Sequence, residues 1–142
     1  MTARIRVAVM AVATVVFCFG CGRTDLPELA EVEGTVTLDG QPLEGVLVSF
    51  YPADEARPGT GVTDAEGHYE LEYLYGEEGT KVGQSRVEVT TIWPDGEPNP
   101  GEVDRVPAQY QGRNSILSFN VQPDDNVFDI PMESGGANGG QN

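Results

Sequence analysis

Residues 34–52, GTVTLDGQPLEGVLVSFYP, decide the fold of this 142-residue chain. Apolar and polar residues alternate on both sides of Asp39-Gly40. That pair suits a tight turn, because glycine tolerates a positive φ and aspartate caps its own backbone. The alternation predicts one strand over 31–38 and a second over 46–51. Both faces of the second strand are largely apolar, so we expect it to be a central strand.

The same period of two runs through the rest of the chain up to residue 132, and no useful stretch has the period of a helix. A turn at 64–67 is expected to form a hairpin, and one at 122–126 to join the last two strands. Seven short strands separated by turn signals predict an all-β fold in which two sheets form a sandwich. The five further strands are predicted over 59–63, 68–74, 85–93, 116–122 and 126–132.

His68 is the only histidine, and acid–base catalysis commonly depends on a side chain of this kind. In the strand over 68–74, His68 and Glu70 are predicted to face solvent beside a turn. A surface histidine without a second histidine or a nearby nucleophile gives neither a catalytic dyad nor a zinc site of usual composition. The sequence therefore predicts no enzyme, no catalytic residue and no cofactor.

Residues 1–20 have the pattern of a secretory signal, with two arginines before an apolar run over 7–19 that is too short to span a membrane. The run ends at Gly20-Cys21, where polar sequence begins. This resembles a bacterial lipoprotein signal, in which the cysteine is diacylated and becomes the new N-terminus. Cys18 stands where such signals usually carry leucine, so ordinary secretion or a retained anchor is the alternative.

These features give a domain layout with one folded body. We expect a signal peptide over 1–20, a tether over 21–30, a β-sandwich domain over 31–133 and a flexible tail over 134–142. Three acyl chains on Cys21 would exceed what stable membrane anchoring needs. The expected location is therefore the cell envelope, anchored to a lipid bilayer and facing the periplasm or the exterior.

Acidic residues dominate the charge: 23 aspartates and glutamates oppose 8 lysines and arginines, a net charge of −15. From Cys21 onward six basic residues remain against all 23 acids, a formal charge of −17. This balance argues against nucleic acid as a partner, because phosphates need a basic surface. It also opposes electrostatic docking on anionic headgroups. A solvated acidic surface and association with divalent cations are the two remaining interpretations.

The stretch over 34–52, followed by TGVTDAEGHYEL over 60–71, resembles the carboxypeptidase regulatory-like family of prealbumin-like (transthyretin-like) domains. The resemblance implies a seven-stranded Greek-key β-sandwich over about 32–132. The whole chain also resembles short envelope lipoproteins of this type that are numerous in planctomycete bacteria. The motifs are shared by domains of many functions, so they imply a fold and not an activity. The residues that match are Gly34, Val36, Gly40, Pro42, Leu43, Gly45, Val48, Thr63, Asp64, Gly67 and Tyr69.

Two aromatic residues are candidate ligand contacts. Trp93, the only tryptophan, is predicted to end a strand at a loop rich in proline and acids over 94–106, and Tyr110 follows that loop. Aromatic rings at loop ends can stack on sugars or anchor a partner. The alternative for Trp93 is that it caps the core of the sandwich.

Acidic turn residues are the other candidates. Calcium takes oxygen ligands from loops, so weak candidates for calcium ligands are Asp124, Asp125 and Asp129. They are weak candidates because they lack the spacing of a dedicated calcium loop. No metal is therefore predicted. The favoured function is a non-catalytic envelope lipoprotein whose sandwich is structural or binds an unidentified envelope protein or glycan. The alternative is a polysaccharide- or peptide-binding module on the cell surface.

Overall fold

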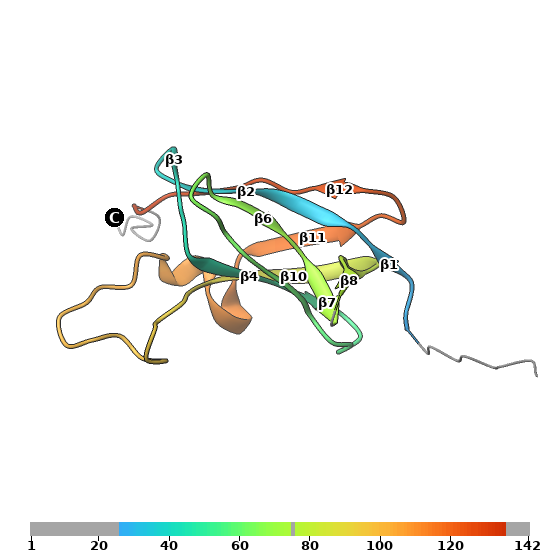
Figure 1. Cartoon of the computed structure of the whole chain (residues 1–142), viewed down its shortest axis with the longest axis horizontal. Helices are drawn as coiled ribbons and strands as arrows, with labels where there is room; N and C mark the ends of the chain where they lie inside the picture. Colours follow the sequence, from blue (N-terminus) through green and yellow to red (C-terminus); the bar gives the residue numbers. More distant parts are fainter. Residues whose placement is uncertain (1–25, 75, 136–142) are drawn as a thin grey trace, which may run out of the picture.

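A computed structural model describes residues 26–74 and 76–135, and it is all-β (Figure 1). Two sheets pack face to face as a sandwich. The predicted signal peptide, Cys21 and most of the predicted tail lie outside the described residues. No helix in the part of the chain that the structure describes is long and apolar enough to cross a membrane.

The larger sheet has six strands, all antiparallel to their neighbours. Its central strand β4 pairs with β10 on one side and β5 on the other, which confirms the central position expected for residues 46–51. Val46, Val48 and Phe50 of β4 are fully buried. In spatial order the strands are β11 (Leu117–Val121), β10 (Gly83–Thr91), β4 (Val46–Pro52), β5 (Gly59–Val62), β7 (Glu72–Leu74) and β8 (Glu77–Glu78).

The second sheet is built around β2 (Val32–Leu38). It pairs antiparallel with β3 (Gln41–Pro42) and β6 (His68–Glu70), and parallel with β12 (Asn126–Val127) and β13 (Ile130–Met132). A turn forms at Asp39-Gly40 as predicted, with positive φ at both residues, but it leads from β2 into β3. The strand predicted over 46–51 is β4 of the larger sheet, so it does not pair with β2. The short elements that complete the chain are β1 (Leu29–Ala30), β9 (Thr80–Lys81) and the 3-10 helices η1 (Ala108–Tyr110) and η2 (Gly112–Asn114).

The segment over 68–74 differs from the prediction, because it is two strands in two sheets and not one strand of a hairpin. The turn before it forms, with the Gly67 N–H donating to the Asp64 carbonyl at 2.9 Å. β6 then pairs with β2, and β7 pairs with β5. The chain crosses between the sheets at Leu71, which is 3% exposed and whose N–H donates to the carbonyl of Val32 at 2.9 Å.

A glycine makes this crossing possible. Gly61 of β5 passes so close to the end of β6 in the other sheet that a Cβ on Gly61 would lie 2.2 Å from the carbonyl oxygen of Glu70. A residue with a side chain could not occupy that position without moving the backbone. The glycine therefore lets the two sheets meet where β6 gives way to β7.

The last two predicted strands also differ, because they do not pair with each other. β11 lies in the larger sheet, whereas β12 and β13 extend the smaller sheet beside β2. The turn over 122–126 therefore links the two layers. The strand over 126–132 is interrupted at Phe128 and Asp129, where the Thr35 N–H donates to the Asp129 carboxylate at 2.9 Å.

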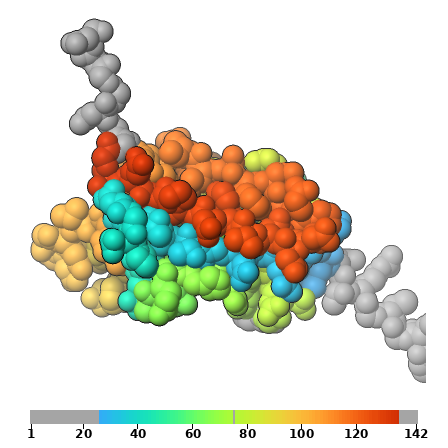
Figure 2. Space-filling view, turned by 90° about the horizontal axis from the view of Figure 1, so that it is seen from above, coloured from blue at the N-terminus to red at the C-terminus, as the bar shows by residue number. Residues whose placement is uncertain are grey.

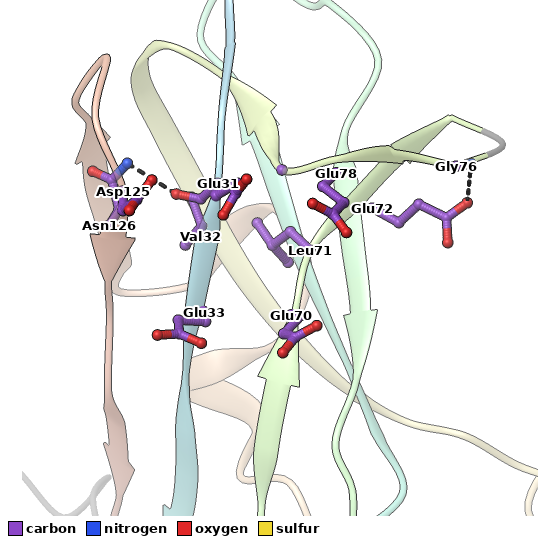
Figure 3. Close-up of a pocket in the computed structure, with 11 residues that line it drawn as sticks. Glu31, Val32, Glu33, Glu70, Leu71, Glu72, Gly76, Glu78, Asp125 and Asn126 are labelled. Atoms are coloured by element: carbon purple, nitrogen blue, oxygen red, sulfur yellow. Dashed lines mark hydrogen bonds between the residues drawn. The ribbon is translucent and has the colours of Figure 1, made fainter.

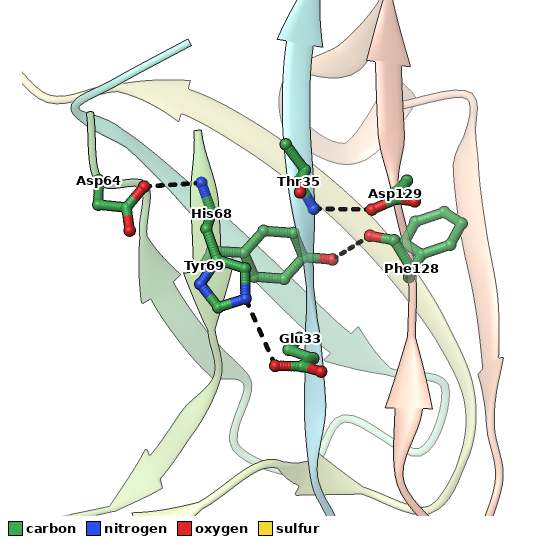
Figure 4. Close-up of polar contacts among 7 residues, drawn as sticks. All are labelled: Glu33, Thr35, Asp64, His68, Tyr69, Phe128 and Asp129. Carbon is green, nitrogen blue, oxygen red and sulfur yellow. Dashed lines mark hydrogen bonds and ion pairs between the residues drawn. The ribbon is translucent and has the colours of Figure 1, made fainter. Parts of the chain in front are cut away.

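Tyr69 links β6 to the segment between β12 and β13 on the other side of β2 in the smaller sheet (Figure 4). It is fully buried, and its hydroxyl donates to the carbonyl oxygen of Phe128 at 2.6 Å. The ring crosses β2 at Gly34, where a Cβ would lie 2.0 Å from that same oxygen. Burial, and then the nearby Asp129 carboxylate, raise the pKa of the Tyr69 phenol.

The termini of the described chain lie at opposite ends of the sandwich (Figures 1 and 2). Residue 26 enters beside β1, whereas the loop over 92–107 and residue 135 lie at the far end. At that end the first residue of the predicted tail is held in place, because the Ser134 N–H and hydroxyl donate to the Asp39 carboxylate at 3.0 and 2.6 Å. These bonds lower the pKa of Asp39.

Candidate functional site

An acidic groove of about 480 Å3 opens where the chain passes from β1 into β2 (Figure 3). Six carboxylates line it, and its lining contains no lysine or arginine. Figure 3 shows them on both sheets, since β2 and β6 belong to one layer and β7 and β8 to the other. The lining residues are Glu31, Val32, Glu33, Glu70, Leu71, Glu72, Gly76, Glu78, Gly79, Asp125 and Asn126.

Glu33 and Glu70, which line this groove, lie close enough to the neighbouring His68 for the three side chains to share one cation. Glu33 lies directly opposite Glu70 in the β2–β6 pair, and His68 projects from the same face of β6 two residues earlier. One ligand atom from each lies within 4.8 Å of the other two, and His68 Nε2 is 3.4 Å from Glu33 Oε2. Within the described ranges, 26–74 and 76–135, this is the only such group of histidine, cysteine or acidic residues.

A second, larger pocket of about 730 Å3 lies on the outer face of the six-stranded sheet. Three arginines reach it from different elements: Arg57 from the loop after β4, Arg86 from β10 and Arg113 from η2. Tyr51, Glu55 and Glu88 also line it. We call it the arginine pocket.

The Arg86 guanidinium is fixed on two sides. Its Nε and Nη2 both donate to Glu88 Oε1, at 3.0 and 2.6 Å, and its Cζ lies 4.9 Å from the centre of the Tyr51 ring. Glu88 is 9% exposed, so its charge is compensated where water has little access. Arg57 and Arg113 are exposed beside this fixed pair.

The basic side chains of the described residues are unevenly placed. Three of the five, Arg57, Arg86 and Arg113, line this one pocket. Of the other two, Lys81 is paired with the Asp54 carboxylate. The hydrogen bond from Lys81 lowers the pKa of Asp54.

The two aromatic candidates from the sequence differ in their surroundings. Trp93 is half-buried. It was predicted to end a strand, but β10 ends two residues earlier at Thr91, so Trp93 lies in the long loop. Tyr110 is only 5% exposed, and its hydroxyl accepts a hydrogen bond from the Glu133 N–H at 3.1 Å. This corrects the expectation for Tyr110, because its ring packs in the core and offers no face to a ligand.

The structure does not bring the calcium candidates Asp124, Asp125 and Asp129 together as a ligand group. All three are exposed, and the Asp129 carboxylate already accepts the N–H of Thr35. The turn over 122–126 is held by the side chain of Asn126. Its amide nitrogen donates to three carbonyl oxygens, those of Glu31, Gln122 and Asp124, at 3.1, 3.1 and 2.6 Å.

Sequence reasoning missed both pockets. Arg57, Arg86 and Arg113 are far apart in sequence and have no common motif, so only the fold shows that they converge. For the cluster of Glu33, His68 and Glu70 a partial signal existed, because His68 and Glu70 were expected to face solvent on one strand. The missing information was that β6 would pair with β2.

No family model and no curated protein matches the chain. Among solved structures it is similar to a DUF3823 family protein from Parabacteroides merdae, with 14% identity and a TM-score of 0.40, over 74% of this chain and 46% of that one. It is also similar to the dioxygenase domain of a dioxygenase carbohydrate-binding protein fusion from Streptomyces sp. SirexAA-E, with 19% identity and a TM-score of 0.37. That likeness covers 78% of this chain and 83% of the other.

The chain thus spans less than half the length of the first of these proteins. At this identity and TM-score the two likenesses carry no argument, and the carboxypeptidase regulatory-like family stands as a resemblance.

Proposed function

We propose that this chain is a non-catalytic cell-envelope lipoprotein whose β-sandwich binds an anionic polysaccharide through the arginine pocket. The net charge of the chain opposes general attraction of polyanions, so recognition would depend on sugar carboxylates that reach the three arginines gathered in this pocket. The observation that carries the proposal is the convergence of Arg57, Arg86 and Arg113 on one concave surface of a chain with few basic residues. The Gly34 and Tyr69 contact supports placing the domain in the carboxypeptidase regulatory-like family, since both residues belong to the motif that resembles it.

The chemistry of the pocket fits a carboxylate-bearing sugar chain. Arginine presents a planar fork of donors that matches a carboxylate in two parallel hydrogen bonds. Because Arg86 is held by Glu88 and Tyr51, it loses little freedom on binding, while Arg57 and Arg113 are free to reach the ligand. A volume of about 730 Å3 lies within the usual range for small-ligand sites.

The only histidine supports a binding role over a catalytic one. The His68 Nε2 atom lies 3.4 Å from the carboxylate of Glu33, and no serine or threonine hydroxyl of the described residues hydrogen-bonds to the imidazole. A histidine in these surroundings has no neighbouring nucleophile to activate. In the proposed envelope setting, Cys21 would anchor the end of the domain at which β1 enters. The loop after Trp93 would then point away from the membrane.

Binding of a defined acidic glycan tests the proposal. The full-length protein in detergent is titrated with oligogalacturonate, a carboxylated sugar chain, and with its methyl ester, which has the same sugar without the charge. We expect saturable binding of the acid form and little of the ester. Arg113→Gln should weaken binding about tenfold, the value of one charge-assisted hydrogen bond. High salt should weaken it further.

Arg105→Gln is the matched control, because it removes the same charge from an exposed arginine outside the pocket. Equal loss of affinity in Arg105→Gln and Arg113→Gln would show a general charge effect and no site. Equal binding of the acid and the ester would show that carboxylates are not recognised. Either result would overturn the proposal.

A further inference from the structure

The face shared by Glu33, His68 and Glu70 contains an electrostatic conflict that a cation would relieve. Two carboxylates directly opposite each other on antiparallel strands repel, and such like-charge pairs are destabilising. The two strands hold the acids in this position, because register fixes which residues face each other. The surrounding groove adds four more acids and no base, which raises the local concentration of cations.

The distance between donor atoms fits a shared metal better than a direct contact. His68 Nε2 and Glu33 Oε2 are 3.4 Å apart, longer than the roughly 2.7–2.9 Å of a charged N–H···O hydrogen bond. Two ligands bound to one metal at about 2.1 Å with a tetrahedral angle lie about 3.4 Å from each other. The third donor, from Glu70, is within 4.8 Å of both.

The backbone that carries these side chains is fixed from both sides (Figure 4). The His68 N–H donates to the Asp64 carboxylate at 2.9 Å, which locks the turn before β6. Tyr69, between His68 and Glu70, is buried and bonded to the Phe128 carbonyl. Only side-chain rotation separates the three donors from a common ligand position, so binding would order little of the chain.

We propose that Glu33, His68 and Glu70 form a binding site for a divalent transition-metal ion of the zinc class. One imidazole and two carboxylates suit zinc and its neighbours, whereas calcium and magnesium prefer sites made only of oxygen. Three protein ligands leave at least one coordination position open to water or to a group of a partner. The site is independent of the arginine pocket, with which it shares no residue.

Calorimetric titration of the untagged full-length protein with zinc chloride tests the site. We expect one zinc ion per chain, and no displacement by a hundredfold excess of calcium. His68→Gln should weaken zinc binding at least tenfold, because it removes the only nitrogen ligand. Glu70→Gln should do the same. NMR of the single imidazole should show a shift that saturates at one equivalent of zinc.

Glu66→Gln is the matched control, since it removes an exposed carboxylate next to the cluster that belongs to neither the cluster nor the groove. It should bind zinc as the wild type does. Thermal melts of the metal-free variants check that each is folded. Absence of saturable binding in the wild type, or equal binding by His68→Gln, would overturn the proposal. In the second case zinc would be held by groove carboxylates alone.

Discussion

Removal of one oxygen atom, by Tyr69→Phe, measures how strongly the Tyr69 hydroxyl stabilises the sandwich. The phenol is fully buried, and its 2.6 Å bond to Phe128 connects β6 to the segment between β12 and β13 across β2. The variant keeps the ring and leaves the Phe128 carbonyl without this donor. Loss of a buried hydrogen bond with an unpaired acceptor costs about 1–3 kcal/mol. For a domain of this size, each kcal/mol of lost stability lowers Tm by about 4–8 °C.

Urea denaturation followed by the fluorescence of Trp93, the only tryptophan, gives the free energy of unfolding. The matched control is Tyr73→Phe. Tyr73 is also buried, at 8% exposure, but its hydroxyl has no hydrogen-bond partner among residues 26–74 and 76–135. We expect the control to change stability by less than about 0.5 kcal/mol. If Tyr69→Phe unfolds at the same urea concentration as the control, the hydroxyl does not stabilise the pairing of β6, β2 and the segment between β12 and β13.

The pH dependence of the free energy of unfolding gives a second comparison between the wild type and Tyr69→Phe. Its pKa is raised in the folded state by burial, and then by the Asp129 carboxylate, so folding favours the protonated phenol. The stability linked to it is fully present below the pKa of an unfolded tyrosine, about 10. It is lost as the pH rises from there through the higher pKa of the folded state. The wild type should therefore lose stability above about pH 10 more steeply than Tyr69→Phe.

Three further predictions concern single side chains. Asn126→Ala should destabilise the domain by about 2–3 kcal/mol, because the amide links the turn over 122–126 to Glu31. Calcium should not restore this loss. A urea midpoint equal to that of the wild type would contradict the prediction. Trp93 is half-buried, so its emission wavelength and its quenching by iodide should lie between those of a buried and a free indole. An emission wavelength typical of a buried indole would instead show that Trp93 caps the core. Cys21→Ser should move the protein from the membrane fraction to the soluble fraction, and an unchanged size and fraction would refute lipidation.

Local alternation was enough to predict most strands. β4 was expected over 46–51 and ends one residue later, and the positive φ angles at Asp39 and Gly40 follow from the two residue types. The exposure of Glu70, predicted to face solvent beside the turn, was also confirmed. These features depend on neighbours in sequence, which is why periodicity identifies them.

Strand pairing could not be predicted in the same way, because partners are far apart in the chain. Nothing in the alternation over 68–74 indicates that the strand changes sheets at Leu71, since the inward and outward order continues through it. The parallel pairing of β12 and β13 with β2 was missed for the same reason. Tyr110 shows a further limit, because a tyrosine near a loop end has the same local sequence whether it packs inward or outward.

The change of sheet at Leu71 is the structural cause of the acidic groove, and it allows the metal proposal to be tested through stability. Because β6 lies beside β2, Glu70 faces Glu33. A continuous hairpin with β5 would have separated them. Glu70→Lys would replace the repulsion between these two residues with attraction, so the metal-free domain should become more stable by about 0.2–1 kcal/mol. The same change removes a ligand and adds a positive charge, so zinc binding should be lost.

Opposite effects on stability and on zinc affinity are what distinguish a metal site from a structural contact. If Glu70 served only the fold, its replacement by lysine would lower stability, and zinc would change the melting temperature of neither protein. Differential scanning calorimetry of the wild type and Glu70→Lys, each with and without zinc chloride, gives all four values. The expected pattern is a higher Tm for the metal-free variant and a zinc-dependent rise in Tm for the wild type alone. A variant that melts lower than the metal-free wild type would show that Glu33 and Glu70 do not repel in the folded protein.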